Sequence, residues 1–138
     1  MTANKGSSDD RRLMSRQQMD EIMRLANIIY FRTKVWDNTY WMGVKTAKCP
    51  MEMWMYQEWI VANRPDVIIE TGTFVGGSAL FFAQVMDMIG HGKVITIDIE
   101  EFHTLPEHPR IEYIVGPSTD TGTIDRVQEA VGDAEKVM

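Results

Sequence analysis

The stretch that decides the fold is Val67-Ile-Ile-Glu-Thr-Gly-Thr-Phe-Val-Gly-Gly-Ser78. Its first four residues form a short apolar run that ends in an acid, which is typical of a buried parallel strand. Three glycines follow, and glycine lets a backbone turn tightly and approach a ligand closely. The segment 78–89 then continues as a helix, and the free N–H groups at a helix start favour an anion. The sequence therefore predicts a strand, a ligand-binding turn and a helix.

The rest of the chain alternates strands and helices in the same way. Downstream, the apolar patterns predict strands over 93–98 and 111–115, a loop over 99–110, a helix over 123–131 and the start of a fourth strand at 136–138. Upstream, they predict helices over 16–33 and 51–63 with an irregular aromatic segment between them. Such alternation with short connections implies parallel pairing and right-handed crossovers. We therefore expect an α/β fold with a Rossmann-like parallel sheet, preceded by N-terminal helices.

This pattern divides the chain into a disordered tail at 1–12, an N-terminal helical segment at 13–64 and a partial Rossmann-like domain at 65–138. The tail is polar and charged, so it has little apolar surface to bury on folding. We expect the sheet to be truncated after about three strands, because the sequence stops where the fourth strand begins.

Composition restricts the class of protein. The net charge of −6 argues against a nucleic-acid-binding protein, which needs basic surface to displace counterions. The apolar segment 79–89 is too short to cross a bilayer, so no transmembrane segment is predicted. The single cysteine, Cys49, excludes an intrachain disulfide and favours a reducing, cytoplasmic location.

Residues that can bind a ligand gather where the predicted strands end. Glu70 ends the first strand, Asp98 ends the second and Gly116 follows the third. Ligands of parallel sheets bind at these ends, and an acid on the second strand can accept hydrogen bonds from ribose hydroxyls. The glycines lack the following lysine of a phosphate-binding P-loop. Phe74 and the wide glycine spacing also depart from the Gly-x-Gly-x-x-Gly pattern of nicotinamide enzymes. The combination predicts a site for a nucleoside cofactor.

Five short motifs resemble a known family over about three quarters of the chain. The stretch 70–78 is similar to motif I of class I S-adenosylmethionine-dependent methyltransferases, in the form found in metal-dependent O-methyltransferases. Gly116-Pro-Ser-Thr-Asp120 is similar to the loop after their third strand. Tyr40-Trp-Met-Gly43, Lys48-Cys-Pro50 and Tyr56-Gln-Glu58 resemble the cephalosporin hydroxylase-like family, which includes rhamnosyl O-methyltransferases.

The resemblance implies S-adenosylmethionine as the cofactor. The implied cofactor-binding residues are Glu70, Gly72, Thr73, Gly76, Ser78, Asp98, Gly116 and Ser118. Among them, the backbone of Gly72 would contact the methionine moiety, Ser78 would bind its carboxylate, and Glu70 would orient the turn. Asp98 would hold the ribose hydroxyls, and Ser118 would flank the adenine.

The implied activity is transfer of the methyl group to a hydroxyl of a sugar, a glycolipid or an antibiotic-like small molecule. The family uses Mg²⁺, and its acidic ligands follow the fourth strand. We expect these ligands beyond Met138, so that the 138 residues bind cofactor weakly and are inactive alone, with catalytic residues unknown. Two alternatives stay open: a fragment of an NAD-dependent Rossmann oxidoreductase, and a non-catalytic cofactor-binding or assembly module. A homo-oligomer is a possible assembly.

Two further groups of residues have two interpretations each. His103 and His108, with nearby glutamates, could bind a metal, but a solvated loop is the favoured interpretation. The aromatic residues before the first strand either line an acceptor site or pack the helices on the sheet; they are Trp36, Tyr40, Trp41, Trp54 and Trp59.

Overall fold

The computed structural model describes residues 14–138, and the predicted tail at 1–12 lies outside them. The chain forms two compact units, one ending at Val35 and the other running over Trp36–Met138. The predicted boundary after residue 64 lies within the second of these units. Within the described residues, we find no helix that is long and apolar enough to cross a membrane.

Helix α1 (Arg16–Arg32) belongs to the first unit. It begins at a capping box, in which the Gln18 N–H donates to the Ser15 hydroxyl and the Ser15 N–H donates to the Gln18 side chain. Each side chain thereby satisfies a backbone donor at the helix start. The helix predicted over 16–33 is confirmed.

The second unit is built on three parallel strands, β3 (Val67–Thr71), β4 (Lys93–Asp98) and β5 (Ile111–Val115), in the spatial order β3-β4-β5. Helix α3 (Gly77–Ile89) connects β3 to β4, and helix α4 (Thr121–Val131) follows β5. These elements are the ones that the sequence predicted, with their ends moved by one or two residues. The predicted parallel sheet is confirmed.

After α4 the chain returns to the other edge of β3. Val137 forms a parallel bridge with Val67. The Met138 N–H donates to the Val67 carbonyl at 2.9 Å, and the Ile69 N–H donates to the Met138 carbonyl at 2.9 Å. The predicted start of a fourth strand is therefore confirmed. Because the direction of strand addition reverses at β3, the carboxyl end of β3 is a topological switch point, where such sheets bind ligands.

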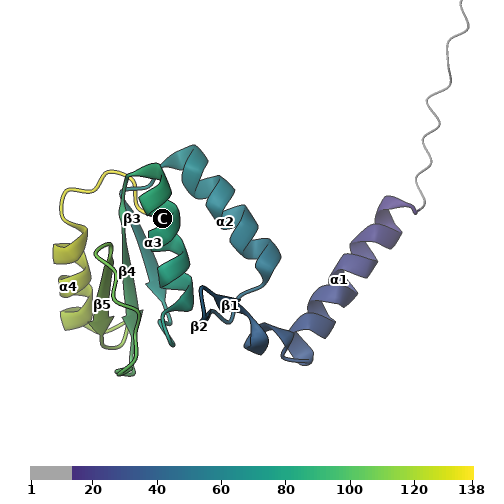
Figure 1. The fold of residues 1–138 in the computed structure, drawn as a ribbon, viewed down its shortest axis with the longest axis horizontal. Coiled ribbons are helices and arrows are strands. Elements are labelled where there is room, and N and C mark those ends of the chain that lie inside the picture. Colours follow the sequence, from purple (N-terminus) through teal and green to yellow (C-terminus); the bar gives the residue numbers. More distant parts are fainter. Residues whose placement is uncertain (1–13) are drawn as a thin grey trace, which may run out of the picture. The chain divides into compact units, whose positions relative to one another are not determined.

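A helix covers each face of the sheet (Figure 1). Alternate strand residues point to opposite faces. The core on the α3 face contains Ile68, Phe81, Phe82, Met86 and Val94. The core on the α4 face contains Val67, Ile95, Ile97 and Ile114, with Val127 and Val131 against them. Both faces are thus apolar, which explains the continuous apolar runs of the strands.

A short hairpin precedes the sheet in a segment that was expected to be irregular. A 3-10 turn η1 (Val35–Asn38) leads into strands β1 (Tyr40–Trp41) and β2 (Val44–Lys45), which pair antiparallel. The turn residues Met42 and Gly43 have φ angles of 49° and 83°, as a two-residue hairpin turn requires. The prediction was wrong here because two-residue strands are too short to show an alternating pattern.

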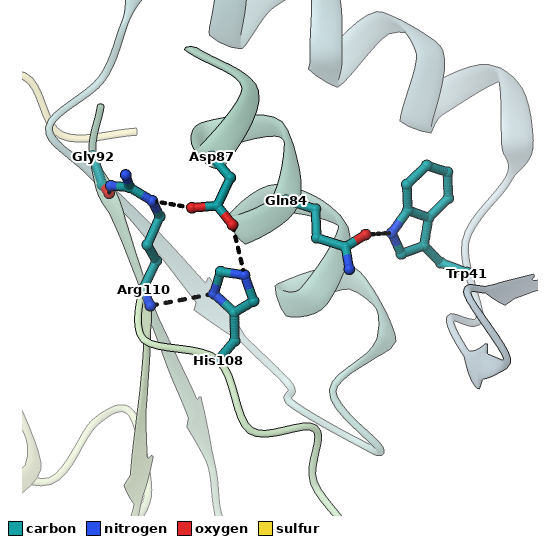
Figure 2. A network of polar contacts seen from close by, with 6 residues as sticks. All are labelled: Trp41, Gln84, Asp87, Gly92, His108 and Arg110. Atoms are coloured by element: carbon teal, nitrogen blue, oxygen red, sulfur yellow. Dashed lines mark hydrogen bonds and ion pairs between the residues drawn. The ribbon is translucent and has the colours of Figure 1, made fainter. Parts of the chain in front are cut away.

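The hairpin and helix α2 (Pro50–Asn63) pack against α3. The ring of Trp41 meets that of Phe81 edge to face, with 4.9 Å between the ring centres. Its Nε1–H donates to Oε1 of Gln84 at 2.8 Å (Figure 2). These contacts explain why residues 36–64 belong to the same compact unit as the sheet.

Candidate functional site

A row of polar side chains crosses the sheet near the start of α3. Glu70 on β3 is in register with Thr96 on β4, which is in register with Tyr113 on β5. Paired residues of parallel strands point to the same face, so the row shares the α3 face. The Tyr113 hydroxyl donates to the Pro106 carbonyl at 2.8 Å. Burial, with a smaller contribution from the charge of Glu70, raises the pKa of Tyr113 to about 12.

The carboxylate of Glu70 is the centre of this row and is only 8% exposed. Ser78 Oγ donates to Oε1 of Glu70 at 2.5 Å, and Thr96 Oγ1 donates to Oε2 at 3.2 Å. The Lys48 Nζ atom lies 3.6 Å from the same Oε1 atom. Burial raises the pKa of Glu70 above its ordinary value, although the two hydroxyls and Lys48 oppose the rise. The carboxylate therefore ties together α3, β4 and the segment before α2.

The glycines of the turn have different surroundings. Gly72 has a φ of 90°, and a Cβ atom added there would meet no described atom within 4 Å. At Gly77, an added Cβ would clash with the Lys45 carbonyl, because the hairpin packs directly on the helix start. At Gly76, it would lie 2.7 Å from Cδ of Pro106. Packing thus explains Gly76 and Gly77, whereas Gly72 leaves open space beside the turn.

Asp98 joins the glycine turn to the ends of β4 and β5. Its Oδ2 atom accepts from the Phe74 N–H at 2.9 Å, and its Oδ1 atom accepts from the Glu100 N–H at 3.1 Å. Its carbonyl accepts from the Gly116 N–H at 2.8 Å. Burial by itself raises the pKa of Asp98, but the backbone N–H donors together lower it below its ordinary value. Asp98 is therefore an ionised acceptor at the carboxyl edge of the sheet.

A cavity of about 330 Å³ opens beside the glycine turn. Its lining residues are Trp36, Asp37, Thr46, Ala47, Lys48, Gly72, Thr73, Phe74 and Ser78. The structure therefore brings three predicted cofactor residues, Gly72, Thr73 and Ser78, to one cavity. Lys48 also lines this cavity but is not among the predicted site residues. The motif that contains Lys48 was visible, but nothing local indicates that its side chain meets Glu70.

The remaining predicted residues surround this cavity to different extents. Hydrogen bonds connect Glu70 to Ser78, and they connect Asp98 to Phe74 and Gly116. Ser118 is exposed in the turn before α4 and is outside this hydrogen-bonded set of described residues. The predicted residues therefore lie along one edge of the sheet, with Ser118 at the end of β5.

The aromatic residues do not form one wall. Tyr40, Trp41 and Trp54 line a second cleft of about 420 Å³ between the hairpin, α2 and α3. Trp36 lines the cavity beside the glycine turn instead, and Trp59 is 43% exposed on α2. The packing interpretation is confirmed for Trp41, which contacts α3, whereas an acceptor site in the cleft stays a prediction.

His108 belongs to a polar network that joins its loop to α3 (Figure 2). Its Nε2 atom lies 3.0 Å from Oδ2 of Asp87, and its Nδ1 atom accepts from the Arg110 N–H at 3.2 Å. The Arg110 Nε–H donates to Oδ1 of Asp87 at 2.5 Å. The side chain of His108 is only 11% exposed, so the solvated-loop interpretation is wrong for it. Residues 14–138 contain no group of three side chains of His, Cys, Asp or Glu that could hold a metal.

Comparison with known proteins identifies similar sequences. A family model described as rhamnosyl O-methyltransferase/CmcI matches residues 33–138. A rhamnosyl O-methyltransferase of Mycobacterium leprae is 39% identical over 102 residues, which cover 72% of this chain and 44% of that protein. The rhamnosyl O-methyltransferase of Mycobacterium tuberculosis (strain ATCC 25618 / H37Rv) is 35% identical over 103 residues, covering 72% and 42%. The chain thus spans less than half the length of these relatives. The family resemblance seen in the motifs is confirmed.

Solved structures share the fold. A structure described as "CmcI-N160 apo-structure" has a TM-score of 0.60 and 24% identity, covering 67% of this chain and 42% of that chain. Another, described as "cmcI-D160 Mg-SAM", has a TM-score of 0.58 and 24% identity, covering 64% and 40%. These similarities confirm the Rossmann-like architecture that the strand and helix pattern predicted.

Proposed function

Because this chain belongs to the rhamnosyl O-methyltransferase/CmcI family, we propose that its second unit is the S-adenosylmethionine-binding part of an O-methyltransferase. The acceptor that we propose is a hydroxyl of a sugar, a glycolipid or an antibiotic-like small molecule. The names of the relatives support a sugar hydroxyl. The activity and the acceptor are proposals, since the chain spans less than half of those proteins.

The observation that carries the proposal is the cavity beside the glycine turn. It lies at the carboxyl end of β3, where the direction of strand addition reverses. Gly72 leaves open space there, and the first turn of α3 adds N–H groups without partners inside the helix. Asp98 offers carboxylate oxygens at the next strand end. The open space, the N–H donors and the carboxylate follow one another along the edge of the sheet. A ligand made of an amino acid joined to a nucleoside fits this arrangement.

Each residue group has a binding task in this proposal. The cofactor supplies a methyl group on a sulfonium. The backbone of Gly72 and Thr73 contacts its methionine part, and the start of α3 attracts the carboxylate through the partial positive charge of a helix N-terminus. Asp98 accepts from the ribose hydroxyls, and the turn at Gly116 and Ser118 lies against the adenine. The protein contributes position and orientation, which bring two reactants into contact geometry.

The described residues do not fit a magnesium site. Mg²⁺ requires several oxygen ligands in octahedral geometry. Residues 14–138 hold no cluster of three suitable side chains, so we assign no step to a metal and no residue to the base. The description "Mg-SAM" belongs to the solved relative.

Isothermal titration calorimetry on the full 138-residue chain tests the cofactor. We expect S-adenosylmethionine and S-adenosylhomocysteine to bind and NAD to give no heat. Binding of NAD alone would overturn the proposal in favour of an oxidoreductase fragment. A second assay follows transfer of a labelled methyl group to a rhamnosyl glycoside. We expect cofactor binding without transfer, because no base is assigned in residues 14–138, and transfer by the 138 residues would contradict the expectation that they are inactive alone.

The compartment and the assembly are further proposals. Cys49 is a free thiol, 7% exposed at the start of α2, which suits a reducing cytoplasm. Cell fractionation tests that location, and secretion into the medium would contradict it. Light scattering tests whether the chain forms a homo-oligomer.

A further inference from the structure

The ammonium group of Lys48 lies where the start of α3 meets the buried carboxylate of Glu70. Its Nζ atom is 3.6 Å from Oε1 of Glu70, the oxygen to which Ser78 Oγ also donates. Lys48 and Ser78 therefore approach the same oxygen from two separate segments. Both residues also line the cavity of about 330 Å³ beside Gly72. A cation and a helix start thus share one cavity.

The geometry allows Lys48 to contact a second anion while it stays near Glu70. The side chain of Lys48 is 33% exposed, whereas that of Glu70 is 7% exposed. Lys48 and Ser78 both line the cavity, so the cavity borders the partly exposed lysine and not the buried carboxylate alone. An ammonium group carries three N–H donors, so Glu70 and another acceptor can be contacted together.

The charges around the cavity define the class of that acceptor. The first turn of α3, from Gly77, presents N–H donors and a partial positive charge. Asp37 is the acidic residue of the lining, and its Oδ1 atom is paired with Lys45 at 2.7 Å. The carboxylate of Glu70 offsets part of the charge of Lys48, which disfavours a dianion such as a phosphate. A ligand carboxylate, with a single negative charge, fits best.

We propose that Lys48 binds the carboxylate of the amino-acid end of the cofactor and makes the site selective for ligands that carry it. This inference rests on the proposed S-adenosylmethionine site. Glu70 acts in it as a positioning residue, because it holds the ammonium beside the start of α3. The segment before α2 thereby contributes a binding group to a site that the sheet alone would leave incomplete.

The test compares two ligands that differ only in this carboxylate. S-adenosylmethionine and its decarboxylated form are titrated into the full chain and into Lys48→Met, Lys48→Arg and Lys136→Met. Lys136 is exposed at the other end of β3, so Lys136→Met is the control for loss of a lysine. Because a charge-assisted hydrogen bond would be lost, we expect Lys48→Met to weaken the affinity for S-adenosylmethionine by about tenfold to a hundredfold. We expect Lys48→Met to change the affinity for the decarboxylated ligand less than about twofold, and Lys48→Arg to restore most of the difference.

Each outcome separates this inference from the proposed function. If Lys48→Met weakens both ligands equally, Lys48 acts through Glu70 and the turn, and the inference is wrong. If the wild-type chain binds both ligands with equal affinity, the carboxylate is not recognised, although the cofactor site stands. If the wild-type chain binds neither ligand, the proposed function itself fails.

Discussion

Ser78 and Glu70 form a buried pair that links the first turn of α3 to the end of β3. The hydroxyl donates to the carboxylate at 2.5 Å across eight positions of sequence, and the two residues are 5% and 8% exposed. The glycine turn lies between them, so its shape depends on this contact. A buried acceptor that loses its hydrogen-bond donor still bears the free-energy cost of its own removal from water.

Ser78→Ala should therefore destabilise the chain by about 1–3 kcal/mol, because the Oε1 atom of Glu70 loses its shortest hydrogen bond. The free energy of unfolding in urea measures the change. Ser118→Ala is the matched control, since Ser118 is exposed. The free energy of unfolding of that control should stay within about 0.5 kcal/mol of the wild-type value. Equal losses in the two variants would contradict a structural role for the pair.

The raised pKa of Glu70 predicts a specific pH dependence. Between the ordinary value of 4.5 and the raised folded value, the folded chain binds more protons than the unfolded chain. The contribution of Glu70 to the free energy of unfolding therefore falls as the pH rises through that window. Glu70→Gln removes the titration, so the wild-type stability relative to the variant should decrease from about pH 4.5 upward. Urea titrations at several pH values measure the difference, and an increase with pH would refute the assignment.

Two glycine substitutions should separate binding from folding. Gly72→Ala places a methyl group in the open space beside the turn at a positive φ angle, which costs about 1–2 kcal/mol. The chain should still fold, with weaker cofactor binding. Gly77→Ala forces a backbone clash with Lys45, so it should prevent folding of the second unit. Circular dichroism measures folding and calorimetry measures affinity. A folded Gly77→Ala variant with normal affinity would show that the hairpin packs differently.

The sequence predicted the elements whose apolar pattern is long enough to be recognised. The strands Val67–Thr71 and Lys93–Asp98 carry continuous apolar runs, and the helix Gly77–Ile89 carries a longer apolar segment. The acids at the strand ends were identified by position alone, since parallel strands share one carboxyl edge. Both parts of the prediction rely on local pattern and on one rule of topology.

What the sequence could not predict depends on contacts between distant segments. Lys48 meets Glu70 only because the hairpin and α2 fold back onto α3. His108 is partly buried only because its loop lies along the helix that carries Asp87. Neither contact has a local signature, and the two-residue strands that begin the fold-back at Tyr40 are too short to be recognised.

Asp98→Ala should weaken S-adenosylmethionine binding by about tenfold or more, because the proposed ribose acceptor is lost. Asp66→Ala is the matched control. The Asp66 side chain also accepts two backbone N–H groups, from Glu135 and Lys136, but at the amino end of β3. Calorimetry should show an unchanged affinity for that variant in its folded form. Equal affinities for wild type and Asp98→Ala would place the ribose elsewhere.

Asp87 should give the opposite pH dependence to Glu70. The hydrogen bond from Arg110 is the largest cause that lowers the pKa of Asp87 below 3.8, and His108 adds to it. A lowered folded pKa stabilises the chain above about pH 3.8, and this contribution disappears as the pH falls through the folded value. Because the Asp87 side chain is 48% exposed, solvent screening limits the effect of Asp87→Asn near neutral pH to about 1 kcal/mol.

Arg110→Lys tests the same contact from the other side: it loses the donor to the Gly92 carbonyl as well, so it should destabilise the chain at least as much. Thermal unfolding at pH 7 and pH 3 measures both variants. A wild-type advantage that grows at pH 3 would show that the network in Figure 2 does not hold Asp87 ionised.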